Sequence, residues 1–269
     1  MIRPNCGLLI RYADDKADFF ENGQVAAAKL AAVMTTAAGM PGAAEIKVMA
    51  SAAFKEAYLE LVPQFERGTG HKVLTLWIPT VQMMSRLKGG ETVDLVIMAA
   101  GAIDELMRLG KIAPGSRVDL AKSGVGVAVS AGAPHPDISS AETLKRALIA
   151  AKSIVISTGP SGVYLAGLFQ RMGIADELKP KLMQVMGEPT GAVIARGEAE
   201  IGFQQMCELL PVAGIDLLEP LPAEIQQITV FSAGLHVDAL APDAARSLIE
   251  FLTAPHAVPV IKRKGMEPA

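Results

Sequence analysis

Three short stretches of the sequence place small residues and hydroxyls at points where a predicted strand is followed by a predicted helix. The longest, STGPSGVYLAGLF at 157–169, has Gly159, Ser161 and Gly162 directly before an apolar run with helical spacing. Free N–H groups and the dipole of a helix N-terminus favour a negative charge such as a carboxylate or a tetrahedral oxyanion. The two glycines would allow a ligand to approach the backbone. The stretch therefore indicates an anion site, although strand-to-helix turns also use Gly, Pro and Ser for backbone reasons alone.

Two further turns have the same character. MASAAF at 49–54 offers Ser51, and WIPTVQ at 77–82 offers Thr80, each where a predicted helix begins. In open α/β sheets, ligands bind in the crevice outside the carboxyl ends of the strands. We therefore expect the three turns to converge on one ligand.

The sequence offers little support for catalysis by familiar motifs. It contains no HExxH, GxSxG, P-loop or GxGxxG. Cys6 and Cys207 match no zinc spacing. Cys207 follows a predicted strand with no histidine near it in sequence, which favours a buried small apolar residue over a thiol nucleophile. We therefore predict no catalytic residue, no metal site and no cofactor, and we leave open whether the protein is an enzyme, with the balance against it.

The elements that must position the three turns alternate along the chain. Apolar strands are predicted at 46–51, 72–78, 93–98, 123–130, 153–157 and 228–235, with amphipathic helices between most of them, and residues 190–205 are predicted to form a helix, a turn and a strand. Ser139 and Glu142 have the spacing of a capping box at one helix start. Continuous apolar strands between such helices predict an α/β fold with a mainly parallel sheet covered on both faces. The Pro- and Gly-rich stretch AGAPHPD separates two such units.

Composition narrows the class of protein. Of 269 residues, 51% are hydrophobic and 20% charged, which excludes a disordered chain, and we expect a soluble monomer. A net charge of −3, one Trp and three Tyr disfavour nucleic acid as a partner. Residues 1–44 are interpreted either as an N-terminal extension or as a degraded signal segment, because Gly42 and Ala44 suit a cleavage site but Lys29 interrupts the apolar core.

Four segments of the chain resemble the molybdate-binding-protein-like group among the periplasmic solute-binding proteins of ABC transporters. They are EIKVMASAAFKEAYLELVPQFERGTGHKV at 45–73, VDLVIMAA at 93–100, PSGVYLAGLFQRMGIADELKPKL at 160–182 and GAVIARGEAEIGFQQ at 191–205. The resemblance covers about residues 45–268. It implies a two-lobed type 2 periplasmic-binding-protein fold with a ligand cleft between the lobes. Residues 45–128 and 229–269 would form lobe 1, and residues 129–228 would form lobe 2.

The resemblance also implies where a ligand would bind. The molybdate binders use serines of the first two turns, backbone N–H groups of a later turn, and a tyrosine after a strand. At the matching positions this sequence has Ala53 with Ser51 nearby, Thr80, the turn around Ser161, and Gln205 in place of the tyrosine. The molybdate cage is therefore not reproduced, and an amide suits a small organic carboxylate as well as an oxyanion. The implied ligand-binding residues are Ser51, Ala53, Thr80, Gly159, Ser161, Gly162, Thr190 and Gln205.

The function implied by the resemblance is the extracytoplasmic solute-binding component of an ABC importer. Its partners would be a small anionic ligand and the transporter permease, and its location would be periplasmic. Aconitate isomerase is similar to the same group, so an isomerase that shifts a double bond in a tricarboxylate is the alternative. Proton transfer of this kind needs a general acid/base, and Glu188 is the candidate. The alternative interpretation of Glu188 is an exposed loop glutamate. A cytoplasmic anion sensor is a third hypothesis, suggested by the poor export signal.

Overall fold

The structure, a computed structural model, describes residues 42–269. The interpretation of residues 1–44 as an extension or a signal segment therefore falls almost entirely outside the described residues, as does Cys6. Among the helices that are described, none has the length and apolar character needed to cross a membrane.

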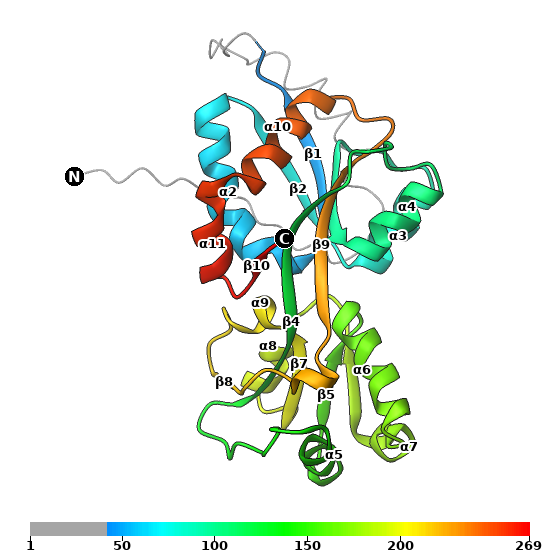
Figure 1. Ribbon diagram of the computed structural model, residues 1–269, viewed down its shortest axis with the longest axis vertical. Helices are drawn as coiled ribbons and strands as arrows, with labels where there is room; N and C mark the ends of the chain where they lie inside the picture. Colours follow the sequence, from blue (N-terminus) through cyan, green and yellow to red (C-terminus); the bar gives the residue numbers. More distant parts are fainter. Residues whose placement is uncertain (1–41) are drawn as a thin grey trace, which may run out of the picture. The chain divides into compact units, whose positions relative to one another are not determined.

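The described chain alternates strands and helices, as Figure 1 shows. The strands are β1 (Glu45–Ala50), β2 (Lys72–Trp77), β3 (Leu95–Ala99), β4 (Val118–Ser130), β5 (Ile154–Ser157), β6 (Leu182–Val185), β7 (Ile201–Gln205), β8 (Ile215–Leu217), β9 (Ile228–Leu235) and β10 (Glu267–Pro268). The α-helices are α2 (Lys55–Thr69), α3 (Thr80–Lys88), α4 (Ala100–Arg108), α5 (Ala141–Ala150), α6 (Pro160–Arg171), α7 (Ala175–Leu178), α8 (Thr190–Ala195), α9 (Met206–Leu209), α10 (Pro242–Thr253) and α11 (Val258–Arg263). Four 3₁₀ turns complete the set: η1 (Ala52–Phe54), η2 (Lys179–Lys181), η3 (Ala223–Ile225) and η4 (Pro255–Ala257).

The strands form one mixed sheet in the order β2-β1-β3-β9-β4-β7-β5-β6, with β8 and β10 paired to β4. The α/β class is confirmed, but the expectation of a mainly parallel sheet is corrected. Parallel pairs lie towards the two ends of this order, whereas β9 is antiparallel to both β3 and β4, and β4 is antiparallel to β7. The two long strands β4 and β9 lie in the middle of the sheet and run in opposite directions (Figure 1). Their antiparallel pairing therefore separates the two groups of parallel strands.

Strand β4 changes partner part way along its length. Its residues 118–124 pair with β9, and its residues 125–129 pair with β7. We call β1, β2, β3, β9 and the first part of β4 the β1 side of the sheet. We call β5, β6, β7, β8 and the second part of β4 the β5 side.

Apolar side chains cover both faces of the sheet on each side. On β3, Leu95 and Ile97 belong to one buried cluster while Val96 and Met98 belong to another, as the two-residue period of a strand requires. The same alternation places Ile154 and Ile156 of β5 in one cluster and Val155 in another. The core predicted from continuous apolar strands is therefore confirmed, and it fixes which face each strand presents.

Helix α5 begins one residue later than its sequence pattern predicts. Ser140, not Ser139, is the N-cap, and it exchanges hydrogen bonds with Thr143 rather than with Glu142. Ser139 instead donates both its N–H and its hydroxyl to Asp137. The capping box is real, but a threonine hydroxyl replaces the expected carboxylate because the start of the helix is shifted by one.

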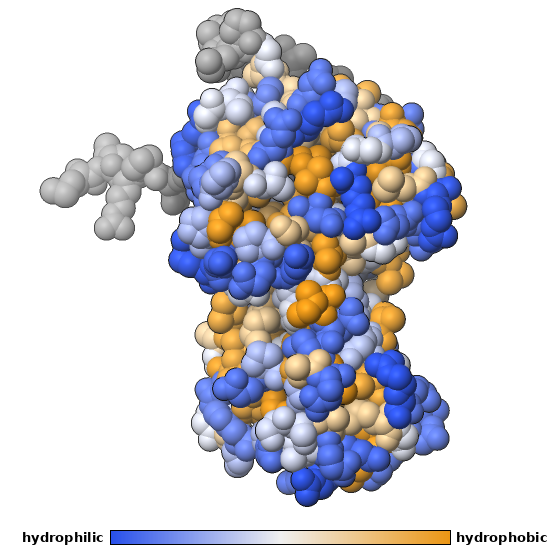
Figure 2. Space-filling view, in the orientation of Figure 1, coloured by the Kyte–Doolittle hydropathy of each residue, from blue (hydrophilic) through white to orange (hydrophobic). Residues whose placement is uncertain are grey.

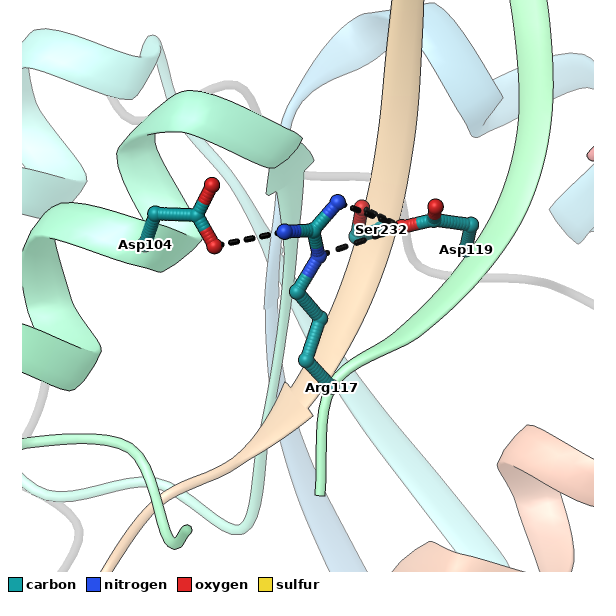
Figure 3. A network of polar contacts seen from close by, with 4 residues as sticks. All are labelled: Asp104, Arg117, Asp119 and Ser232. Atoms are coloured by element: carbon teal, nitrogen blue, oxygen red, sulfur yellow. Dashed lines mark hydrogen bonds and ion pairs between the residues drawn. The ribbon is translucent and has the colours of Figure 1, made fainter. Parts of the chain in front are cut away.

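A polar network holds the start of β4 against its neighbours, as shown in Figure 3. Arg117 lies between Asp104 of α4 (2.6 Å) and Asp119 of β4 (2.9 Å), and the hydroxyl of the buried Ser232 of β9 donates to Asp119 (2.6 Å). Burial would raise the pKa of Asp119, but the hydrogen bonds from Ser232 and Arg117 outweigh it and lower that pKa. The network therefore fixes β4, β9 and α4 to one another on the β1 side.

The surface seen in Figure 2 is largely hydrophilic over the helices. Hydrophobic residues are interspersed, and some show near the middle of the view, where β4 and β9 pass in Figure 1. Exposed large apolar side chains include Val81, Val163 and Ile228. Single exposed apolar residues are normal on a folded protein, so this surface alone assigns no function.

Candidate functional site

The predicted site residues lie at the carboxyl ends of strands on both sides of the sheet. Ser51 follows β1, Thr80 begins the helix after β2, and Gln205 ends β7. The short helix α9, which follows Gln205, packs against η1, which follows Ser51. This contact brings the strand ends of the β1 side and the β5 side towards each other.

Ser51 combines burial with an unused hydroxyl. Its backbone N–H donates to the Ile97 carbonyl (2.9 Å), but its buried Oγ has no hydrogen-bond partner. Ala53 belongs to the large apolar core of the β1 side, so its methyl group offers nothing polar. Within residues 42–269, four buried side-chain polar atoms lack a partner, and two of them belong to Ser51 and Gln205 of the predicted site.

Thr80 is the first residue of α3 and is half-buried. Pro79 occupies the N-cap and makes no side-chain bond to the helix. The hydroxyl of Thr80 and the first N–H groups of α3 therefore lie together at the end of β2. They offer a ligand neutral donors only.

The turn between β5 and α6 is organised around Ser157. The hydroxyl of Ser157 accepts from the Gly159 N–H (3.2 Å) and lies 3.4 Å from the hydroxyl of the buried Ser161. Pro160 has no N–H, and Val163 donates its N–H to the Gly159 carbonyl (3.1 Å). The first turn of α6 therefore presents the N–H groups of Ser161 and Gly162.

Gly162 also has a packing reason to be glycine. A Cβ atom there would lie 1.7 Å from the Ser157 carbonyl oxygen, so only glycine lets α6 sit this close to the end of β5. Gly159 differs, because a Cβ there would meet the nearest atom, Ser157 Oγ, at an ordinary 3.4 Å. The two glycines, which look alike in the sequence, therefore have different structural requirements.

Gln205 is fully buried at the end of β7. Its Nε2 donates to the hydroxyl of Thr229 on β9 (2.9 Å), and its Oε1 is one of the unpartnered buried atoms. A threonine hydroxyl can donate as well as accept. With the amide turned over, Thr229 would donate to Oε1, and Nε2 would become the free group. Gln205 can thus offer a ligand either an acceptor or a donor.

Thr190, by contrast, directs its polar groups at a neighbouring side chain. Its N–H (2.7 Å) and its hydroxyl (3.0 Å) both lie within hydrogen-bond distance of Gln204 Oε1. Gln204 Nε2 then donates to Glu208 Oε1 on α9 (2.9 Å). Burial raises the pKa of the Glu208 carboxyl to about 7, against the opposing effect of the Gln204 hydrogen bond.

The other residues considered from the sequence have structural surroundings. Glu188 is exposed and paired with Arg196 (3.0 Å), which also binds Glu198 (2.6 Å). Cys207 is buried in the core of the β1 side, and burial raises the pKa of its thiol far above the usual range. This environment agrees with the interpretation of Cys207 as a small apolar residue.

The histidines do not assemble with one another or with acids into a site. In the described part of the chain no group of three His, Cys, Asp or Glu side chains is placed to hold a metal ion. His236 is buried, and its Nδ1 accepts the N–H of Asp238 (3.1 Å). Burial lowers the pKa of His236, so a neutral ring is favoured.

Sequence reasoning missed three polar residues that bond to the predicted site residues or to their neighbours: Ser157, Glu208 and Thr229. It also preferred Gln205 to the adjacent Gln204 as the ligand-binding amide. Gln204 lies on β7 and Glu208 on α9, so no single helical or strand spacing predicted their contact. No sequence pattern predicted the role of Thr229, because its hydrogen bond with Gln205 joins two strands that are separated in the sequence.

Comparison with known proteins places this chain in a family. The family model described as bacterial extracellular solute-binding protein matches residues 46–267. The chain therefore belongs to the bacterial extracellular solute-binding protein family, and its resemblance to the molybdate-binding-protein-like group is confirmed.

Individual relatives span nearly the same length. The chain is 37% identical to aconitate isomerase of Pseudomonas sp. over 83% of this chain and 87% of that protein. It is 27% identical to the molybdate-binding protein ModA of Azotobacter vinelandii over 83% of this chain and 90% of that protein.

The solved structures show the fold. The periplasmic molybdate-binding protein of Azotobacter vinelandii superposes with a TM-score of 0.69 at 20% identity, covering 83% of this chain and 99% of that chain. The architecture of the described residues thus matches type 2 periplasmic binding proteins.

Proposed function

We propose that this protein binds a small organic polycarboxylate between the carboxyl ends of the β1-side and β5-side strands. The observation that carries the proposal is the pair of buried, unpartnered polar atoms, Ser51 Oγ and Gln205 Oε1, in two of the predicted site residues. Buried polar groups in proteins almost always have a partner, and a bound carboxylate would supply one by accepting from Ser51 Oγ and, with the Gln205 amide turned over, from Gln205 Nε2. The proposal includes the cleft between two lobes, residues 45–128 with 229–269 and residues 129–228.

The chemistry of the donors favours a carboxylate with neutral partners. The residues that we assign to the site are hydroxyls, an amide and the first N–H groups of α6, and none of them is lysine or arginine. The helix N-terminus supplies partial positive charge, and hydroxyls and amides supply directional hydrogen bonds. Ala53 and Gln205 stand where the molybdate binders carry a serine and a tyrosine, so a molybdate cage would lack two of its donors.

A thermal-shift screen tests this proposal. A ligand that binds only the folded state raises the melting temperature, by an amount that grows with the logarithm of its concentration over Kd. We expect di- or tricarboxylates to raise the Tm by several degrees, and molybdate, tungstate and sulfate to raise it less. Stabilisation by molybdate alone would overturn the choice of ligand class, and no stabilisation by any anion would overturn the site.

We place this binding outside the cytoplasm, as the solute-binding component of an ABC importer with a permease as partner. The support is membership of an extracellular solute-binding family. The expected result is a mature protein whose N-terminus, read by mass spectrometry after expression in the native host, begins near Ala44 and is recovered in the periplasmic fraction. A full-length protein in the cytoplasm would favour an anion sensor instead.

A second candidate function is the isomerisation of a tricarboxylate. The observation that favours it is the 37% identity to a protein named aconitate isomerase, extending over most of both chains. Incubation of the purified protein with cis-aconitate should then produce the trans isomer. A protein that binds tricarboxylates but leaves cis-aconitate unchanged is a binding protein only.

A further inference from the structure

Glu208 has a hydrogen-bond arrangement whose orientation is fixed. Gln204 Oε1 faces the Thr190 N–H (2.7 Å), and a backbone N–H can only donate, so this side of the amide must be the oxygen. The other side of the amide is therefore the NH₂ group, which donates to Glu208 Oε1 at 2.9 Å. The carboxyl of Glu208 is thus held in place from one side by a group that is itself immobilised.

The position of Glu208 ties it to the candidate site. It lies in the short helix α9 and is joined through Gln204 to Thr190, one of the predicted site residues. The N-terminus of α9 is Gln205 at the end of β7, and α9 packs against η1, which follows Ser51. Glu208 is half-buried, so its carboxyl is partly removed from water and remains accessible.

Charges around α9 leave the Glu208 carboxyl without a balancing cation. The elements packed most closely against α9 are β4, η1, β7 and α8, and among these only β4 carries charged side chains, Asp119 and Lys122. Arg263 and Lys264 line a pocket with Cys207, but both are paired with Glu60. Asp119 is occupied by Arg117 and Ser232, and Lys122 lies opposite Glu267 of β10. Among the ion pairs of residues 42–269, none includes Glu208.

The neighbouring Cys207 is buried and stays a thiol, because burial raises its pKa. Burial likewise raises the pKa of Glu208 to about 7, so this carboxyl can hold or release a proton near neutral pH. Glu188, the acid that the sequence suggested, is instead exposed and bound to Arg196. The two glutamates therefore have opposite surroundings.

We propose that Glu208 is the proton-transferring group of this site and exchanges a proton with the bound polycarboxylate. The inference rests on the polycarboxylate binding proposed above. For cis-aconitate, the Glu208 carboxylate takes a proton from the methylene carbon, and the C–H electron pair spreads over the adjacent double bond and its carboxylate. The same proton then returns to the former vinylic carbon, which moves the double bond and leaves Glu208 ionised. No oxidant, reductant or second substrate is consumed.

The test compares the wild-type protein, Glu208→Gln and the control Glu188→Gln. Glutamine at 208 keeps an oxygen for Gln204 but cannot carry the proton. Isomerisation is followed from cis- to trans-aconitate, and binding is followed by thermal stabilisation with propane-1,2,3-tricarboxylate, which has no double bond to move. General acid–base catalysis contributes about 10²- to 10⁴-fold, so we expect a rate loss of that size in Glu208→Gln with stabilisation retained. We expect Glu188→Gln to stay within about twofold of the wild type.

The outcomes separate this inference from the function on which it rests. A wild-type rate in Glu208→Gln overturns the role of Glu208 and leaves isomerisation standing. If the wild type binds propane-1,2,3-tricarboxylate without isomerising cis-aconitate, titration calorimetry at pH 7 in two buffers of different ionisation enthalpy decides. Proton exchange on binding that disappears in Glu208→Gln supports the proposal, and equal or absent exchange in both proteins overturns it. If no polycarboxylate binds at all, the proposed function fails, and this inference fails with it.

Discussion

The two sides of the sheet treat the polar residues at their strand ends differently. On the β5 side these residues bond to one another or to β9: Ser157 with Ser161, Gln204 with both Thr190 and Glu208, and Gln205 with Thr229 of β9. On the β1 side, Ser51 has a buried hydroxyl with no hydrogen-bond partner among the described residues. Most polar groups at the strand ends of the β5 side are therefore hydrogen-bonded in the free protein, whereas the Ser51 hydroxyl on the β1 side is not.

This difference separates structural from ligand-directed roles. A substitution on the β5 side should disturb the fold and binding together, because the same atoms serve both. A substitution of Ser51 should affect binding alone, since its hydroxyl stabilises nothing in the free protein. The proposed experiments test that separation.

The largest effect is expected at Gly162. Alanine there would place a Cβ 1.7 Å from the Ser157 carbonyl oxygen and force α6 away from β5. We expect Gly162→Ala to lower the free energy of unfolding by about 3 kcal/mol, the upper range for overpacking. Urea unfolding measures it. The matched control is Gly159→Ala, where the nearest atom is 3.4 Å away, and an equal loss in both variants would contradict the packing account.

Ser51→Ala should give the second largest effect, and on binding only. A hydrogen bond to a charged group contributes about 1.5 to 3 kcal/mol, so we expect Kd for a polycarboxylate to rise about ten- to hundredfold. The Tm of the free protein should not fall, because the Oγ has no partner to lose. Ser85→Ala, at an exposed position of α3, is the control. Unchanged affinity in Ser51→Ala would remove Ser51 from the site.

Thr190→Val removes one of the two donors to Gln204 and should cost stability on the β5 side. The expected loss is about 1 kcal/mol in the free energy of unfolding, typical of one hydrogen bond. Thr190→Ser keeps the hydroxyl and should recover most of this loss. If the serine variant is no better than valine in chemical denaturation, the hydroxyl is not what stabilises the network.

A pH dependence of stability is expected from Glu208. Its folded pKa of about 7 lies above the ordinary value of 4.5, so between these values the folded state binds more protons than the unfolded state. Its contribution to stability is therefore fully present below about pH 4.5 and is lost as pH rises through 7. We expect Glu208→Gln to gain stability relative to the wild type from pH 5 to pH 8, measured as the difference in Tm. A difference that does not change with pH would contradict the raised pKa.

Much of the fold follows from local patterns in the sequence. β9 is predicted to the residue at 228–235, because its run of apolar residues is long enough to mark a strand. The short strands β6, β8 and β10 were not predicted, since two to four residues carry too little periodicity. The mixed direction of the sheet was missed for another reason. It depends on how β4 and β9 pair across more than a hundred residues of sequence.

The position of the predicted site residues in the fold followed from the sequence, whereas their contacts followed only in part. Ser51, Thr80 and Ser161 were assigned because strand ends in α/β sheets gather ligand-binding residues, and Gln205 was assigned from the family resemblance. That these residues bind one ligand stays a prediction. No local pattern predicts the hydrogen bond from Thr190 to Gln204, because it depends on tertiary packing. The same holds for the burial that raises the pKa of Glu208.

A crystal structure of the protein with a bound tricarboxylate tests the central claim most directly. We predict carboxylate oxygens within hydrogen-bond distance of Ser51 Oγ, of the Gln205 amide and of the N–H groups of Ser161 and Gly162. A tricarboxylate bound elsewhere, with Ser51 Oγ and Gln205 Oε1 still unpartnered, would contradict the account.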